Sequence, residues 1–159
     1  MVCNAARIET GDPTFHMLGK DAYTPSVARI TDALDDEASA LARAVGLDWV
    51  PRQEREFPYH PFARDTYERM HTWFLEVCEG PWSLKSRYLV EDVRYGLRLF
   101  SSLGDMFDVP TPVCDAVITV GSILVEEDFW KTGRTVETLG IEPSWSLKQL
   151  DKYLETGKA

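Results

Sequence analysis

Residues 24–46 read TPSVARITDALDDEASALARAVG, and the spacing of their apolar side chains predicts one long amphipathic helix. The apolar residues recur at steps of three and four and share one face, which consists of Val27, Ile30, Leu34, Ala38, Leu41 and Val45. Thr24 can cap the first turn, Pro25 is tolerated at the first helical position, and Gly46 can end the helix. The free N–H groups of the first turn could also bind an anion, so residues 24–27 are either a capped helix start or an anion site.

The same periodicity, followed outward from this stretch, predicts further helices over residues 62–77, 89–107, 113–128 and 147–154. On the helix over 89–107, the residues expected to face the core are Leu89, Val93, Leu97, Phe100 and Leu103. Residues 1–23 carry scattered Gly, Asp and Pro and are expected to form turns and extended chain, while the rings of Trp130 and Trp145 are expected to be packing anchors. No segment alternates apolar and polar residues as a half-buried strand does, so we expect an all-α fold of about five helices in a single domain over residues 1–159.

The length and charge of the chain restrict the classes of function. A chain of 159 residues with 44% hydrophobic and 27% charged residues has the composition of a globular domain. Its net charge of −9 disfavours binding to nucleic acids and to anionic membranes, and no apolar run approaches the roughly 20 residues that span a bilayer. Cys3, Cys78 and Cys114 are too far apart for a disulfide framework or a metal motif, so we expect a reducing, cytoplasmic location.

Motifs for the common cofactors and nucleophiles are absent from the sequence. It contains neither GxGxxG nor GxxxxGK[ST], so no glycine-rich turn is available for a pyrophosphate. His16, His60 and His71 lie at no metal-ligand spacing, and no serine or cysteine lies in a nucleophile elbow. We therefore expect this chain by itself to bind no nucleotide cofactor and no metal.

Two polar clusters are candidates for a site. The denser cluster, RYLVED at residues 87–92, contains Arg87 and Asp92. Its carboxylates could simply favour a helix start through the helix dipole; alternatively, Arg87 could pair with a substrate carboxylate while Asp92 holds a catalytic base in position. The second cluster contains Asn4, Arg7 and Glu9, which form either a local surface salt bridge or the lining of a site next to another domain.

Six strings of the sequence, taken in order, resemble one family. They are NAARIE (4–9), TPSVAR (24–29), RYLVEDV (87–93), VPTP (109–112), DFW (128–130) and GRT (133–135) with LG (139–140). Together they resemble the C-terminal helical domain of the octopine/nopaline (opine) dehydrogenases, a fold similar to the C-terminal domain of 6-phosphogluconate dehydrogenase. The resemblance covers almost the whole chain and is strongest over residues 87–141 and weakest over 47–82.

The resemblance implies an activity and roles for individual residues. Members of the family join the amine of an amino acid to a 2-keto acid such as pyruvate and reduce the imine with NADH or NADPH, which an N-terminal Rossmann domain holds. Asp92 matches the aspartate that acts with the family's catalytic histidine, and Arg87 matches an arginine at the substrate. Asn4, Arg7 and Glu9 would line the substrate side of the same cleft.

Two departures from the family pattern shape the functional hypothesis. The family's His-Pro motif directly precedes the string that begins at Asn4, which places the histidine before Met1; His60-Pro61 has the same dipeptide at another position. Arg94 stands where the family often has proline. We therefore expect a substrate domain that acts with a Rossmann domain on a separate chain, or that associates with itself through the surface left uncovered. The alternative is a helical binding or interaction module that has kept the fold and lost the chemistry.

Overall fold

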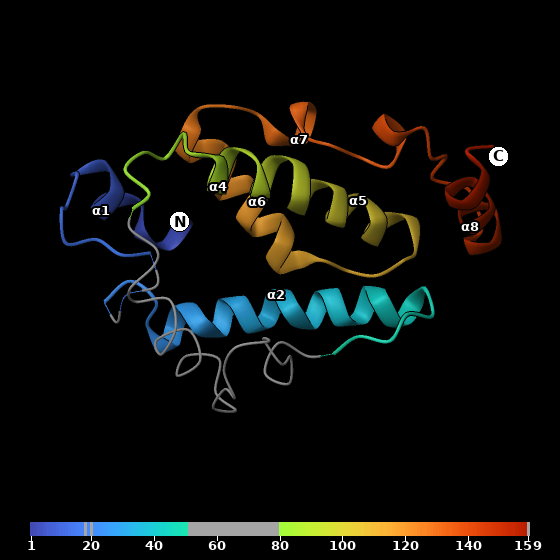
Figure 1. The fold of residues 1–159 in the computed structure, drawn as a ribbon, viewed down its shortest axis with the longest axis horizontal. Helices are drawn as coiled ribbons and strands as arrows, with labels where there is room; N and C mark the ends of the chain where they lie inside the picture. Colours follow the sequence, from blue (N-terminus) through green and yellow to red (C-terminus); the bar gives the residue numbers. More distant parts are fainter. Residues whose placement is uncertain (18, 20, 51–79, 159) are drawn as a thin grey trace.

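The computed structural model describes residues 1–17, 19, 21–50 and 80–158, and over these ranges the chain is helical (Figure 1). Its elements in chain order are η1 (Val2–Asn4), α1 (Ala5–Glu9), α2 (Pro25–Ala44), α4 (Arg87–Val90), η2 (Asp92–Leu97), α5 (Arg98–Met106), α6 (Pro112–Val125), α7 (Phe129–Thr132), η3 (Glu137–Leu139) and α8 (Leu147–Thr156). Within these ranges there is no strand, and an isolated bridge joins His16 to Gly80. The predicted all-α fold is confirmed, while the helix predicted over 62–77 lies outside the described residues.

Helix α2 runs along one side of the molecule, and α5 and α6 pack against it and against each other (Figure 1). The short helix α7 contacts α6 and η2, while η1 and α1 lie at one end of the molecule and α8 lies at the other. None of the helices in the described part of the chain is both long and apolar enough to cross a membrane.

Helix α2 begins and ends where its sequence predicts. The hydroxyl of Thr24 accepts a hydrogen bond from the Val27 amide at 3.5 Å, so capping is the arrangement that the structure shows at this helix start. At the other end the helix stops at Ala44, and Gly46 adopts a φ of +75°, which glycine tolerates best. The predicted apolar face is only partly correct, because Ile30 is 39% exposed. The buried side of α2 instead follows Ala28, Glu37, Ser39, Leu41 and Ala42.

The predicted helix over 89–107 is interrupted by a π-helical turn, η2. The amide of Gly96 donates to the carbonyl of Glu91, five residues earlier, at 3.3 Å, as a π-turn requires. A π-turn rotates the chain more slowly per residue than an α-helix, so apolar residues spaced four apart stay on one face. Leu89 and Val93, with exposures of 0% and 6%, both face the core in this way.

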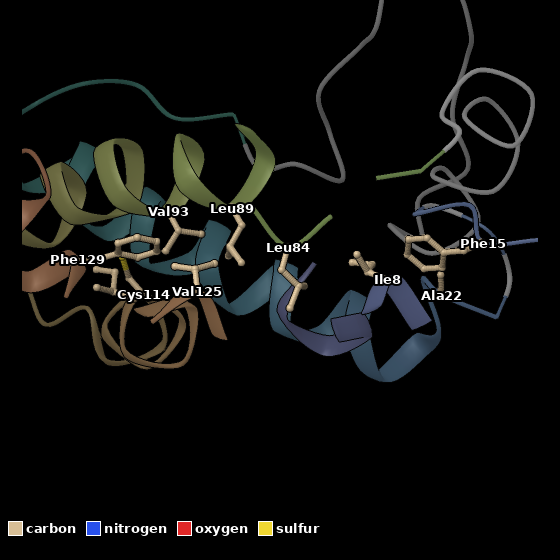
Figure 2. Packing of buried hydrophobic residues seen from close by; sticks show 10 residues of the cluster. Ile8, Phe15, Ala22, Leu84, Leu89, Val93, Cys114, Val125 and Phe129 are labelled. Atoms are coloured by element: carbon tan, nitrogen blue, oxygen red, sulfur yellow. The ribbon is translucent and has the colours of Figure 1, made fainter. Parts of the chain in front are cut away.

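The main core lies where α6 meets α4, η2 and α7. Its largest fully buried side chains are Phe15, Phe129, Leu89 and Ile118. Figure 2 shows Val93 next to the Phe129 ring and Leu89 beside Val93, with Ile8 and Phe15 extending the cluster toward the N-terminal segment. The prediction of turns and extended chain for residues 1–23 is therefore wrong for η1 and α1, because burial of Ile8 at 2% exposure favours a helical turn over the local turn propensity.

A buried carboxylate joins α2 to the start of α6. Glu37 is 9% exposed, and its two oxygens accept the amides of Val113 and Cys114 at 2.7 and 3.0 Å. No side chain at the start of α6 caps that helix, so Glu37 supplies the missing acceptors from a neighbouring element. Its negative charge also lies at the positive end of the α6 dipole.

A second cluster anchors the C-terminal helix α8. It contains Val136, Ile141 and Leu150, against which Trp145 packs, and the Trp145 ring lies 5.1 Å from that of Tyr153. Trp145 is thus a packing anchor, as predicted. Trp130 is more open, because it is 37% exposed and packs beneath the guanidinium of Arg98 at 5.0 Å.

Candidate functional site

Asp92 is the first residue of the π-turn and is exposed. Within the described ranges, no hydrogen bond or ion pair engages its carboxylate. The helix-dipole explanation accounts poorly for its position, because α4 precedes Asp92 and the chain continues directly through η2 into α5. π-turns are rare and often occur at functional sites. The turn therefore presents a carboxylate that is free to bind an external group.

Arg87 is the first residue of α4, and its side chain is 65% exposed. Its guanidinium carbon lies over the Tyr88 ring, 4.9 Å from the ring centre, in a cation–π contact. The only carboxylate that approaches it among the described residues is that of Glu91, at 3.8 Å. An exposed pair at this distance contributes little to stability, so the planar guanidinium of Arg87 can still donate hydrogen bonds to a second carboxylate.

An open hollow of about 570 Å³ lies next to Arg87. It is lined by Lys85, Arg87, Val90, Glu91, Tyr95 and Arg134. Among the described residues, the lining places three cations against one carboxylate, an unusual balance in a chain whose net charge is −9. Asp92 adjoins the hollow through its neighbour Glu91 but does not line it. The charge of this lining therefore suits the hollow to an anion.

One rim of the hollow is fixed by the contact between η2 and the loop after α7. Arg94 pairs with Glu127 at 2.7 Å, and its Nε donates to the carbonyl of Thr132 at 3.2 Å. The carbonyl of Arg94 accepts the amide of Arg134, also at 3.2 Å. A Cβ on Gly133 would lie 2.5 Å from the Arg94 carbonyl oxygen, so only glycine allows this close approach. Arg94, which stands where the family often has proline, thus holds the loop in place.

The second cluster predicted from the sequence lies in η1 and α1 and does not line this hollow. Asn4 donates to the carbonyl of Ala22 at 3.0 Å, which ties it to the N-terminal loop. Glu9 is exposed and makes no ion pair with Arg7. Of the two alternatives for this cluster, a salt bridge between Arg7 and Glu9 is therefore not formed.

The carboxylates that pair with Arg7 are those of Asp12 and Asp21, at 2.6 and 2.5 Å. The loop after α1 brings both of them back to the arginine, which spacing along the sequence does not reveal. Hydrogen bonds from Thr14, followed by those from Arg7, lower the pKa of Asp12 to about 2. This network stabilises the N-terminal loop and leaves Arg7 little capacity for a substrate.

The described cysteines and histidine, which are Cys3, Cys114 and His16, do not line the hollow. No group of three or more His, Cys, Asp and Glu side chains among the described residues could hold a metal ion. Burial raises the pKa of the Cys114 thiol to about 12, which keeps it protonated, while Cys3 is exposed. His60 and His71, like Cys78, lie outside the described residues.

Over the described residues, fold and site together define a helical domain with an exposed arginine in the lining of a cationic hollow and an exposed aspartate next in sequence to that lining. Residues 1–125 match the family described as NAD/NADP octopine/nopaline dehydrogenase, alpha-helical domain. The chain belongs to this family.

Three relatives illustrate the similarity. The chain is 36% identical to an opine dehydrogenase of Arthrobacter sp. (strain 1C), in a match that covers 87% of this chain and 38% of the relative. It is 30% identical to the protein named ocs of Agrobacterium tumefaciens (strain Ach5), over 75% of this chain and 34% of the relative. It is 27% identical to a vitopine synthase of Allorhizobium ampelinum, in a match that covers 75% of this chain and 34% of the relative. The chain thus spans little more than a third of the length of these relatives.

Arg87 and Asp92 were identified from the sequence, whereas Lys85, Tyr95 and Arg134 were not singled out for a site. Arg134 belongs to the string GRT at 133–135, so its position was noted without a role. No sequence motif marks Lys85 or Tyr95 as a site residue, because it is the tertiary contact with the loop after α7 that brings them together with Arg134.

Proposed function

We propose that this chain is the substrate-binding and catalytic helical domain of an NAD(P)-dependent opine dehydrogenase. The reaction is the reductive condensation of an amino acid with a 2-keto acid such as pyruvate. The observation that carries the proposal is the exposure of both Arg87 and Asp92 in a domain of this family, with Arg87 engaged among the described residues by a weak ion pair to Glu91 and a contact with Tyr88. The cationic hollow beside them gives a carboxylate substrate a local site on an acidic chain.

The two residues have different roles in this proposal. Arg87 pairs with a substrate carboxylate through its planar fork and so orients the substrate. Asp92 accepts a hydrogen bond from a histidine that another part of the enzyme supplies, which fixes the tautomer of that histidine and stabilises its protonated form. Arg87 is then a binding residue and Asp92 a positioning residue.

The nicotinamide cofactor supplies the hydride when it is bound. The described residues offer no strand followed by a glycine-rich turn, the arrangement that usually cradles a pyrophosphate. In our proposal a Rossmann domain elsewhere in the protein, or on a partner chain, holds the cofactor. The exposed Cys3 and the protonated thiol of Cys114 are compatible with a reducing, cytoplasmic location.

Reconstitution tests this function. The chain is mixed with the separately produced nucleotide-binding domain of the Arthrobacter opine dehydrogenase, and oxidation of NADH or NADPH is followed by absorbance. We expect oxidation that requires both an amino acid and a 2-keto acid. Arg87→Gln should raise the KM for one of these substrates, while Arg29→Gln, an exposed arginine on α2, should not. A folded mixture without any turnover would instead favour a non-catalytic interaction module, acting by self-association or with a partner protein.

A further inference from the structure

Two cations of the hollow are left without a role by this proposal. Lys85 and Arg134 are both exposed, and within the described ranges the side chain of neither has a hydrogen bond or an ion pair. Arg134 instead stacks on Tyr95, with its guanidinium carbon 5.3 Å from the ring centre. Arg94 stacks on the same ring at 4.9 Å, so the aromatic ring contacts two guanidinium groups.

The positions of these cations are set by the fold. Lys85 follows Leu84, which is only 7% exposed and belongs to the main core, and the Lys85 amide donates to the Ser83 hydroxyl at 3.1 Å. Arg134 is held by the hydrogen bond that its backbone amide donates to the carbonyl of Arg94. The three cations of the hollow thus come from the loop before α4, from α4 itself and from the loop after α7.

The charge balance indicates what the hollow binds. One carboxylate of a substrate would neutralise Arg87. Of the described lining residues, Glu91 would then be the one carboxylate facing Lys85 and Arg134, and it already approaches Arg87. A second carboxylate on the same ligand would neutralise the remaining cations. We propose that the hollow takes a dicarboxylic substrate, with Arg87 binding one carboxylate and with Lys85 and Arg134 binding the other. This inference rests on the proposed function and assigns Lys85 and Arg134 as its specificity residues.

A direct binding experiment on the chain itself tests the inference. Glutarate, a dicarboxylate, and butyrate, a monocarboxylate of similar length, are titrated at low ionic strength and followed by NMR shifts of the Tyr95 and Arg134 amides. Each exposed ion pair contributes roughly a two- to fivefold gain in affinity, so we expect glutarate to bind about five- to tenfold more tightly. The preference should weaken as salt is added.

Substitutions of single residues show which side chains cause the preference for glutarate over butyrate. Lys85→Gln and Arg134→Gln should each reduce the preference for glutarate, and the double substitution should remove it, while butyrate still binds through Arg87. Both side chains are exposed, so the substitutions should leave the fold intact. Lys148→Gln, an exposed lysine on α8, should have no effect. Equal binding of the two acids, or a glutarate preference that survives the double substitution, would overturn the inference.

Turnover by the chain mixed with the separate nucleotide-binding domain shows whether the keto acid or the amino acid carries the second carboxylate. A dicarboxylic keto acid is compared with pyruvate, and a dicarboxylic amino acid with a neutral one of similar size. A Lys85→Gln-sensitive preference for either dicarboxylate supports the inference. Turnover of monocarboxylic substrates alone overturns the inference and leaves the proposed function standing. Absence of all turnover, together with a glutarate preference in the isolated chain, contradicts the proposed function but supports the dicarboxylate site.

Discussion

Replacing Glu37 by alanine should destabilise the whole domain, because this one carboxylate joins α2 to the start of α6. The substitution removes two hydrogen bonds to the amides of Val113 and Cys114, at 2.7 and 3.0 Å, from a side chain that is only 9% exposed. Hydrogen bonds to charged groups contribute about 1.5–3 kcal/mol each, and water can reach the partly buried Val113 amide once the carboxylate is gone. We therefore expect a loss of roughly 3 kcal/mol in the free energy of unfolding.

Thermal and urea unfolding, followed by circular dichroism, measure this loss. For a domain of this size, a loss of about 3 kcal/mol corresponds to a fall in Tm of roughly 6–12 °C. Glu37→Gln keeps one acceptor and should lose about half as much, while Asp36→Ala, an exposed carboxylate on the same helix, should change stability by less than about 0.5 kcal/mol. If the free energy of unfolding of Glu37→Ala lies within about 0.5 kcal/mol of the wild-type value, the reasoning that α6 depends on this acceptor is refuted.

Three further predictions concern the loop after α7, the N-terminal loop and the buried thiol. Gly133→Ala should lose about 2 kcal/mol on denaturant unfolding, because its Cβ would lie 2.4 and 2.5 Å from two backbone oxygens. Gly96→Ala, whose Cβ would meet nothing within 4 Å, serves as control, and equal stability of the two variants would contradict this prediction. The pKa of Asp12 is lowered from 3.8 to about 2, so its contribution to stability is complete above pH 3.8 and is lost as pH falls through about 2. Carboxyl NMR titration checks this, and a midpoint near 3.8 would count against it. Burial raises the pKa of the Cys114 thiol to about 12, so Cys114 should react with iodoacetamide at pH 8 at least about 100-fold more slowly than the exposed Cys3. Peptide mass spectrometry measures the two labelling rates. Comparable labelling of the two cysteines in the folded chain would show that burial does not protect the thiol.

The elements of the fold that depend on local chemistry could be predicted from the sequence. The bounds of α2 follow from Thr24, Pro25 and Gly46, which act within one helical turn of their own position. The π-turn at Asp92–Leu97 could not be predicted, because the same apolar spacing fits a continuous α-helix equally well. The role of Glu37 in capping α6 could not be predicted either, because its hydrogen-bond partners lie 76 and 77 residues away in the sequence.

The same distinction applies to the candidate site. Arg87 and Asp92 lie five residues apart on one continuous segment, so a short string was enough to identify them. The cationic hollow needs Arg134, which reaches Tyr95 only because Gly133 allows the loop after α7 to approach η2. The partners of Arg7 were missed for a similar reason, because Asp12 and Asp21 reach it through the folding of a loop.

The central claim, that Asp92 serves catalysis in an opine dehydrogenase-type reaction, is tested most directly by one rate measurement. Asp92→Asn and Asp105→Asn, the latter an exposed aspartate on α5, are each mixed with the same nucleotide-binding domain and assayed for amino-acid- and keto-acid-dependent NAD(P)H oxidation. We predict that Asp92→Asn lowers kcat by about 100-fold or more and shifts its pH profile, with Tm unchanged, while Asp105→Asn keeps the full rate. Full turnover by a folded Asp92→Asn variant, with an unshifted pH profile, would contradict the claim.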